Sequence, residues 1–431
     1  MKYIENANQY VIFCLTVLLL LLGLNSFFFI MKEAFGYGCG TFLFPSVDRF
    51  ADTIKTSLSY KELLQNIPNF NMSIIDNLDP LYQQYFFNNN YLSEELSHFH
   101  LMPLTTLLCI LVCYAIGYGL SPSLIMWTLF LFCIILLYFS TNHIIKSYKK
   151  SLLLVVLVIV SYPLIYIVTR GNYAAFLCGI GVLAFLNSLF INKKLDFLSL
   201  FLFSIALNFR PNALLILLAL PLLLGIRESL WPAFKIGLIS LLIYVLIYFI
   251  VHYIYHAYTI TTFLNALAVY NNSYFAGISG LFFNSSLHGA LKLLGALFEI
   301  PLIYATLMFY IFSVIILIIL AMLVFKKKSI TEYYPFILSS VYILLTPVAG
   351  DYHLIIFVFP LFIIYTNYDI WKNDRNTLIL ITTSTLLLLS PKNYYFFAPY
   401  LSLQIIINPM IMLLTTLYLL YKNEKNNLLQ A

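Results

Sequence analysis

The stretch that decides the fold is IYATLMFYIFSVIILIILAMLVF, residues 303–325, which contains no charged side chain. About 20 apolar residues in an α-helix cross the roughly 30 Å hydrocarbon layer of a bilayer, so this stretch predicts a membrane-spanning helix. Lys326, Lys327 and Lys328 follow it directly and form the tightest basic cluster of the chain. Such clusters concentrate at cytoplasmic helix ends, so we expect these lysines to face the cytoplasm.

The whole chain shares the composition of this stretch. Its 431 residues are 62% hydrophobic and 9% charged, whereas a soluble domain carries about 25% charged residues. Apolar runs recur along the chain, the first at residues 11–31, and no clear internal repeat is visible. We therefore predict an all-α, polytopic helical membrane protein with 12 or 13 spans, built as one integral membrane domain over residues 1–431. The net charge of +6 is scattered over loop ends and indicates no nucleic-acid partner.

Basic residues at the span ends predict the orientation of the chain. The residues expected on the cytoplasmic side are Lys193, Lys194, Arg227, Lys326 to Lys328, Lys372, Arg375, Lys422 and Lys425. This arrangement places Arg170, Arg210, Asp351, Lys392 and residues 256–288 on the opposite side. The polar loop of residues 32–100 joins them there if the N-terminus lies inside.

One basic cluster disagrees with this orientation. Counting full crossings from the second span places Lys146, Lys149 and Lys150 outside. Either one span within residues 101–169 does not cross fully, or this cluster breaks the positive-inside rule. Pro163 could mark a broken helix in this region, because proline interrupts helical hydrogen bonding.

The only long polar segment, residues 32–100, holds eight of the 17 acidic residues of the chain. Within it, residues 44–60 read FPSVDRFADTIKTSLSY, and Asp48 and Asp52 are four positions apart. On a helix this spacing puts both carboxylates on one face. Two interpretations stay open: a solvated helix in a loop, or a carboxylate held at the membrane surface to accept a proton from a hydroxyl.

Two arginines lie where charge is costly. Arg170-Gly171-Asn172 follows an apolar span directly, and Arg210 lies between two apolar pieces that are each too short to span. A charged residue at membrane depth marks a pathway or a site by default. Arginine binds phosphate through two parallel hydrogen bonds, so Arg210 is a candidate phosphate ligand. For Arg170 the alternative is a side chain that extends to the membrane surface from a helix end.

Further polar residues share the predicted outer side. The segment of residues 256–290 is rich in tyrosine and asparagine and includes Asn284 and His288, a composition suited to sugars or to an interfacial loop. Asp351 and His353 lie in a tight gap between two spans, and Lys392 follows a later one. The cysteines form no CxxC pair, so no metal site, redox site or cofactor is expected.

Six short motifs resemble those of a known family when taken in order. They are FLFPSVDRFAD (residues 42–52), MPLT (102–105), TRGN (169–172), NFRP (208–211), GDYHLIIFVFPL (350–361) and SPKNYY (390–395). Together they resemble the GT-C superfamily of membrane glycosyltransferases, specifically the proteins similar to glycosyltransferase family 87. The resemblance covers most of the chain, in scattered pieces.

The resemblance implies a cell-membrane enzyme with an extracytoplasmic active site. Such proteins transfer a sugar, typically mannose, from a polyprenyl-phosphate donor to a lipid or glycan acceptor. The acidic residue of the first external loop, Asp52 with Asp48 as the alternate, would be the base. Arg210 stands where the family usually has lysine, and His353 replaces the basic residue of another motif. A neutral histidine binds phosphate less well, which leaves Arg210, Arg170 and Lys392 as the expected phosphate ligands, with Asn172 beside them.

Two other functions compete with glycosyl transfer. A polysaccharide polymerase of the O-antigen kind also has long external loops and arginines. A lipid-linked glycan flippase or transporter would also place charges at depth, but it predicts charges near the midplane and matching halves. The chain shows neither of these features, because its unusual charges lie at one predicted surface.

Overall fold

The computed structural model describes residues 16, 19–23, 51–58, 60, 63, 102–277, 284–326, 333–367, 374–390 and 404–430. These residues form helices joined by short turns, with no β-strand among them. Most of the predicted first span, residues 11–31, lies outside the described residues. The all-α, polytopic helical architecture predicted from the composition is confirmed.

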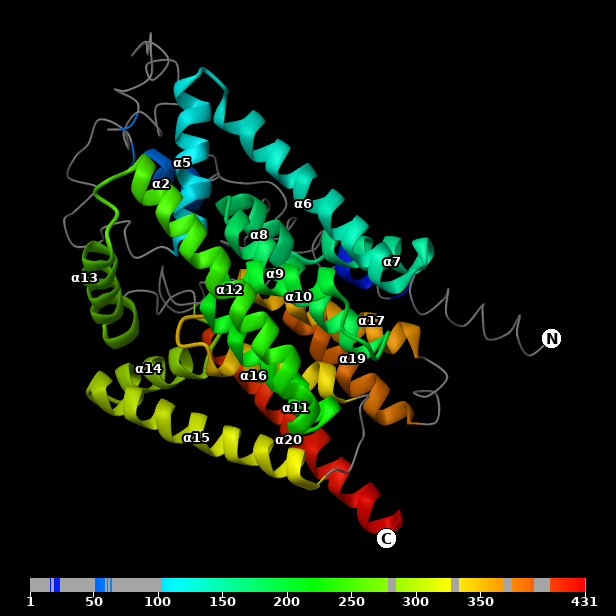
Figure 1. The fold of residues 1–431 in the computed structure, drawn as a ribbon. Helices are drawn as coiled ribbons and strands as arrows, with labels where there is room; N and C mark the ends of the chain where they lie inside the picture. Colours follow the sequence, from blue (N-terminus) through cyan, green and yellow to red (C-terminus); the bar gives the residue numbers. More distant parts are fainter. Residues whose placement is uncertain are drawn as a thin grey trace.

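The helices follow one another along the chain as shown in Figure 1. Their bounds are α2 Ala51–Leu58, α5 Pro103–Gly117, α6 Pro122–Ile145, α7 Tyr148–Ile159, α8 Tyr162–Arg170, α9 Tyr173–Phe190, α10 Phe197–Phe209, η5 Pro211–Leu218, α11 Ala219–Leu224, α12 Ile226–Ile254, α13 Ile260–Tyr270, η6 Asn271–Ala276, α14 Leu287–Leu297, α15 Leu302–Lys326, α16 Tyr334–Leu345, η8 Asp351–Phe357, α17 Val358–Thr366, α19 Arg375–Leu389 and α20 Gln404–Gln430.

Five described helices are long and apolar enough to cross a membrane: α6, α9, α12, α15 and α20. The pair α7 and α8 makes a sixth if it is counted as one span bent by 63°. Seven further apolar helices in the described segments have 10–17 residues, which is shorter than the roughly 20 residues of a full crossing. The prediction of 12 or 13 complete spans therefore stays a prediction.

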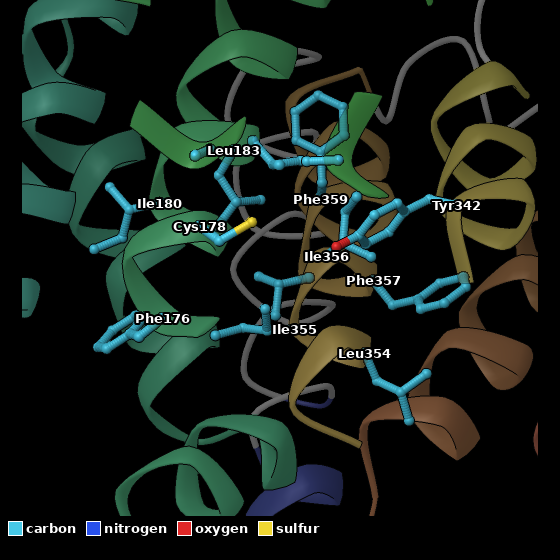
Figure 2. Packing of buried hydrophobic residues seen from close by; sticks show 14 of the residues in the cluster. Phe176, Cys178, Ile180, Leu183, Tyr342, Leu354, Ile355, Ile356, Phe357 and Phe359 are labelled. Carbon is cyan, nitrogen blue, oxygen red and sulfur yellow. The ribbon is translucent and has the colours of Figure 1, made fainter. Parts of the chain in front are cut away.

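The core is built around α9, which is buried along nearly its whole length. Helix α10 packs closely on it at Gly181, where an added Cβ would lie only 2.8 Å from the Cβ of Ala206. On another side, Cys178 lies opposite Ile356 of η8 and Tyr342 of α16 (Figure 2). By contrast, α12 and α15 expose most of their apolar side chains, as expected for helices that contact lipid.

The helical structure is interrupted at both positions where the sequence predicted a helix break. Helix α8 begins after Ser161, with Pro163 in its first turn, where proline costs no helical hydrogen bond. Helix α10 ends at Phe209, Arg210 is extended at φ −144°, and Pro211 begins η5. A broken helix near Pro163 and a split at Arg210 were both predicted from the sequence.

The helical segments on either side of Arg210, α10 before it and η5 with α11 after it, form a hairpin. Ser204 and Asn208 of α10 donate hydrogen bonds to Ile236 and Ser240 of α12 in the same order along both helices, so α10 and α12 run parallel. Because α12 starts directly after α11, η5 and α11 must lead back from Arg210 toward the start of α10. The 13 residues of α10 cover about 20 Å at 1.5 Å per residue, so Arg210 lies short of a full crossing.

The turn after α6 lies beside the turn after α9. Asn192 donates a hydrogen bond of 2.5 Å to the carbonyl of Ile144, two residues before Lys146. The cluster of Lys146, Lys149 and Lys150 therefore shares an end of the molecule with Lys193, as the positive-inside rule expects. The length of α5 favours the first alternative, because its 15 residues are fewer than the roughly 20 of a full crossing.

A hydrogen-bonded ion pair joins three helices farther along the chain. Lys422 of α20 bonds Asp374, the N-cap of α19, and Tyr333, the N-cap of α16, donates to the same carboxylate at 3.0 Å. Partial burial pushes the pKa of Asp374 upward, but the hydrogen bonds from Lys422, Thr377 and Tyr333 outweigh it, so the pKa lies below its usual value. We call this region, together with the turns after α6 and α9, the basic end.

Candidate functional site

A cavity of about 540 Å³ opens at the other end of the bundle, which we call the cavity end. It lies where α8, α10 and α16 end and where α5 and α9 begin. Its lining residues are Thr53, Thr56, Met102, Thr105, Leu108, Cys109, Asn172, Ala174, Phe209, Arg210, Pro211, Asn212, Phe263, Leu267, Tyr270, Asn271, Tyr274, Phe275, Thr346, Pro347 and Val348. Among these lining residues Arg210 is the single charged side chain, and none is acidic.

Neutral groups hold the guanidinium of Arg210. Its Nη2 donates a hydrogen bond of 3.2 Å to Oδ1 of Asn172, and its Cζ lies 5.0 Å from the ring centroid of Tyr352, over the ring. The amide and the ring fix the direction of the guanidinium without neutralising its charge. The fixed positive charge is therefore directed at the cavity.

The sequence around Asn172 explains its position. Gly171 ends α8 with φ 68°, a left-handed conformation that glycine adopts without steric cost. Asn172 then caps α9, and its Oδ1 also accepts a hydrogen bond from the amide of Ala175 at 3.2 Å. Arg170, the last residue of α8, is half-buried and is not part of the cavity lining. Of these two predicted residues only Asn172 lines the cavity, and ligand contact by Arg170 stays a prediction.

Helix α2 forms the wall of the cavity near the start of α9. The hydroxyl of Thr53 donates to the carbonyl of Gly171, and Thr53 and Thr56 both line the cavity. Asp52 belongs to the first turn of α2. Asp48 lies outside the described residues, as does Lys392.

Two predicted ligand residues are engaged within the protein. The side chain of Asn284 donates to Pro347 at 2.7 Å and accepts from the amides of Ser286 and Ala349. Asp351 accepts a hydrogen bond of 2.8 Å from Ser285. Both side chains are buried and neither lines the cavity. They join the segment before α14 to the segment before η8, which positions the cavity wall at Thr346 to Val348.

The two predicted histidines are also buried. Nε2 of His288 is 3.1 Å from the hydroxyl of Thr306, and the ring packs between Phe275 and Phe309. His353 is close to Arg210 instead: with it, His353 lines a small separate pocket of about 10 Å³. Neither histidine lines the large cavity, so direct ligand contact by His288 or His353 stays a prediction.

The structure also reveals site residues that the sequence did not single out. Thr53 and Thr56 line the cavity, Tyr352 holds Arg210, and Lys292 is a fully buried cation on α14. Lys292 was detectable in the sequence as a lone charge in the apolar run LHGALKLLGAL. In the described part of the chain, no three His, Cys, Asp or Glu side chains gather as metal ligands would.

A second, more apolar groove of about 330 Å³ adjoins the cavity. It lies between the α10–η5 break and α12, and it shares Met102 and Pro211 with the cavity. Leu214, Leu241 and Tyr244 also contribute to it. The groove therefore leads from the surroundings of Arg210 toward the exposed apolar surface of α12.

Comparisons of the chain with protein-family models, with curated proteins and with solved structures found no match.

Proposed function

We propose that this protein is a multi-pass glycosyltransferase of the cell membrane that resembles the GT-C superfamily. In this proposal it transfers a hexose from a polyprenyl-phosphate donor to a lipid or glycan acceptor at the extracytoplasmic face. The observation that carries the proposal is the placement of α2, with Asp52 in its first turn, on the wall of a cavity that contains one fixed cation, Arg210.

The charge of Arg210 suits a phosphodiester. A sugar linked to a lipid through one phosphate carries a single negative charge, and Arg210 supplies a single positive one. A guanidinium directed by Asn172 and Tyr352 is preorganised, so it would stabilise the charge that develops on the departing phosphate. The other lining residues are amides, hydroxyls and aromatic rings, which offer hydrogen bonds and apolar faces to a sugar.

The shape of the site suits a lipid-linked donor. The groove beside η5 and α12 adjoins the cavity at Met102 and Pro211. A prenyl chain in this groove would extend toward the exposed apolar face of α12 while the phosphate stays at Arg210. Because the prenyl chain of a membrane donor already lies in apolar lipid, the groove would orient the donor by packing against the chain rather than by removing it from water.

Within this proposal, the carboxylate of Asp52 accepts the proton of the acceptor hydroxyl. The hydroxyl oxygen then forms a bond to the anomeric carbon of the donor sugar, on the face opposite the phosphate. The bond between that carbon and the phosphate oxygen breaks, and its electron pair leaves with the lipid phosphate beside Arg210. The reaction inverts the configuration of the sugar.

The test is transfer from a radiolabelled polyprenyl-phosphate hexose by the purified protein in lipid nanodiscs, with a membrane lipid extract as the acceptor pool. Asp52→Asn should lower the rate about 10²–10⁴-fold, because removal of a general base typically costs this much, while donor binding is retained. Glu228→Gln is the matched control, since Glu228 is an exposed carboxylate near the start of α12.

Near wild-type transfer by Asp52→Asn would exclude Asp52 as the base. Asp48→Asn should cost less, and an inactive Asp48→Asn beside an active Asp52→Asn would assign the base to Asp48. Donor binding by the wild-type protein with no transfer to any acceptor would favour the flippase alternative over an enzyme.

A further inference from the structure

Lys292 is a charged side chain buried inside the protein. It lies in the middle of α14 and is 1% exposed. Its Nζ donates hydrogen bonds to two backbone carbonyls, those of Tyr274 at 3.0 Å and Gly277 at 2.7 Å. No carboxylate among the described residues pairs with it. Burying an ammonium group without a counter-ion is costly, so its position calls for a specific role.

Both acceptors of Lys292 belong to one wall of the cavity. Helix α13 continues into the π-helical turn η6, and together they supply Tyr270, Asn271, Tyr274 and Phe275 to the cavity lining. We call these four residues the aromatic wall. The rings of Tyr270 and Tyr274 are stacked at 4.7 Å with an angle of 17° between their planes.

The C-terminal end of the aromatic wall is attached to α14 and α15. In Figure 1, α13 lies at one side of the bundle, with α14 and α15 close to the end of the wall. There Phe275 packs against His288 of α14 and Phe309 of α15. The carbonyls that end a helix carry partial negative charge, so the ammonium of Lys292 stabilises this end electrostatically as well as by hydrogen bonding.

The space at this attachment is tight. An added Cβ on Gly277 would lie 2.5 Å from the backbone oxygen of Ser273. The last turn of the wall therefore cannot accept a side chain at residue 277 without moving. Lys292 and the close turn at Gly277 thus both lie at the end of the wall that contains Tyr274.

The chemistry of the wall fits a sugar ring. The C–H groups on one face of a hexose pack on an aromatic ring, and its hydroxyls need amide partners such as Asn271. Both Tyr270 and Arg210 line the cavity. A phosphate at Arg210 would therefore carry its sugar toward the wall.

We propose that the aromatic wall, held in position by Lys292, is the saccharide subsite of this cavity. The inference rests on the proposed function, because it assumes a donor whose phosphate lies at Arg210. Lys292 is a positioning residue in it: the cation fixes the backbone of Tyr274 and Gly277, and the rings contact the sugar.

The experiment compares the binding of two ligands to the protein in nanodiscs: polyprenyl monophosphate, and the same lipid carrying a hexose. The wild-type protein should bind the sugar-bearing lipid more tightly. Tyr274→Leu should lower the affinity for this lipid roughly tenfold, as expected for loss of an aromatic contact, and leave the bare lipid phosphate unchanged. Lys292→Met should do the same, with partial recovery in Lys292→Arg.

Each outcome decides a separate point. If Lys292→Met weakens both ligands equally, Lys292 supports only the general fold and the positioning role is wrong. If the wild-type protein binds both lipids equally, the aromatic wall is not a saccharide subsite. If it binds neither, the proposed function itself fails. If Lys292→Met does not fold, the affinities of Tyr274→Leu and Gly277→Ala for the two lipids are compared instead.

Discussion

The two ends of the helix bundle hold their cations in opposite ways. At the basic end, Lys422 bonds the carboxylate of Asp374, which also caps α19 and accepts a hydrogen bond from Tyr333. At the cavity end, Arg210 is held by an amide and an aromatic ring, and Lys292 by two backbone carbonyls. The charge of Lys422 is therefore neutralised by a carboxylate inside the protein, whereas Arg210 and Lys292 are oriented by neutral groups and form no ion pair with a carboxylate among the described side chains.

This difference separates structural charges from functional ones. An ion pair such as Lys422 with Asp374 satisfies itself and fastens helices together, so it has little to offer a ligand. A cation fixed by neutral groups keeps its attraction for an anion, and the protein tolerates its burial cost at a site. The comparison predicts that variants at the cavity end change ligand binding, and that variants at the basic end change stability.

The largest effect is expected from removal of the uncompensated charge. Arg210→Ala should lower transfer from the polyprenyl-phosphate hexose about 10²–10³-fold, as loss of a preorganised charge-stabilising group does. Arg210→Lys should retain partial activity, because lysine keeps the charge without the planar fork. The measurement is the transfer assay with donor titration. Normal donor affinity and rate in a folded Arg210→Ala would remove Arg210 from the site.

A single substitution can give Arg210 a carboxylate partner, as Asp374 is for Lys422. Asn172→Asp places a carboxylate at the position whose amide oxygen now accepts from Arg210, while aspartate still caps α9. The new ion pair should reduce donor affinity at least roughly tenfold and leave thermal stability equal or higher. Asn172→Ser, which caps the helix without a charge, is the control. Unchanged affinity in Asn172→Asp would show that the charge of Arg210 is not what binds the donor.

A smaller, purely structural effect is expected at Asn284, which lies at the cavity end but forms three hydrogen bonds inside the protein. Asn284→Ala removes three hydrogen bonds at a buried position and should destabilise the protein by about 3 kcal/mol, because the partners lose their bonds. Donor affinity per folded molecule should stay the same. Chemical denaturation and lipid binding measure the two quantities, and a selective loss of affinity would place Asn284 in the site after all.

The smallest effect is expected at the basic end. Lys422→Met should cost about 0.2–1 kcal/mol, the usual range for a partly exposed ion pair, and leave transfer unchanged. Because the pKa of Asp374 is lowered in the folded protein, the contribution of the pair is complete at neutral pH. It is lost as the pH falls through that lowered pKa, below about 4. A stability difference from wild type that persists at pH 2 would contradict this assignment.

The sequence was sufficient for features that depend on local chemistry. The apolar runs and the low charge predicted the helical membrane architecture, since a bilayer requires long apolar helices. Pro163 and the pair Arg210-Pro211 predicted the two breaks, because proline and charge disturb an apolar helix wherever it packs. The sequence also showed that the cluster at Lys146 disagrees with the positive-inside rule. The short length of α5, which favours one of the two explanations, is known only from the structure.

Other features depend on contacts between distant segments and could not be read from residue types. Asn284 and Asp351 were predicted as ligand-facing residues; in the structure they form hydrogen bonds with Pro347 and Ser285, and ligand contact by either stays a prediction. The partners of Lys292 are backbone carbonyls, which every residue has, so no side-chain pattern marks them. Asp48 and Lys392 lie outside the described residues, and Asp52 as the base stays a prediction.

The close contact of α9 and α10 at Gly181 has a consequence for how the protein is made. Helix α10 is too short to cross a bilayer and ends at a charged residue, so it is a poor substrate for insertion by itself. Joined to α9 by a short turn and packed on it without a gap, it can enter the membrane as one arm of a helical hairpin. During biosynthesis, insertion of α9 together with α10 would then place Arg210 within the membrane.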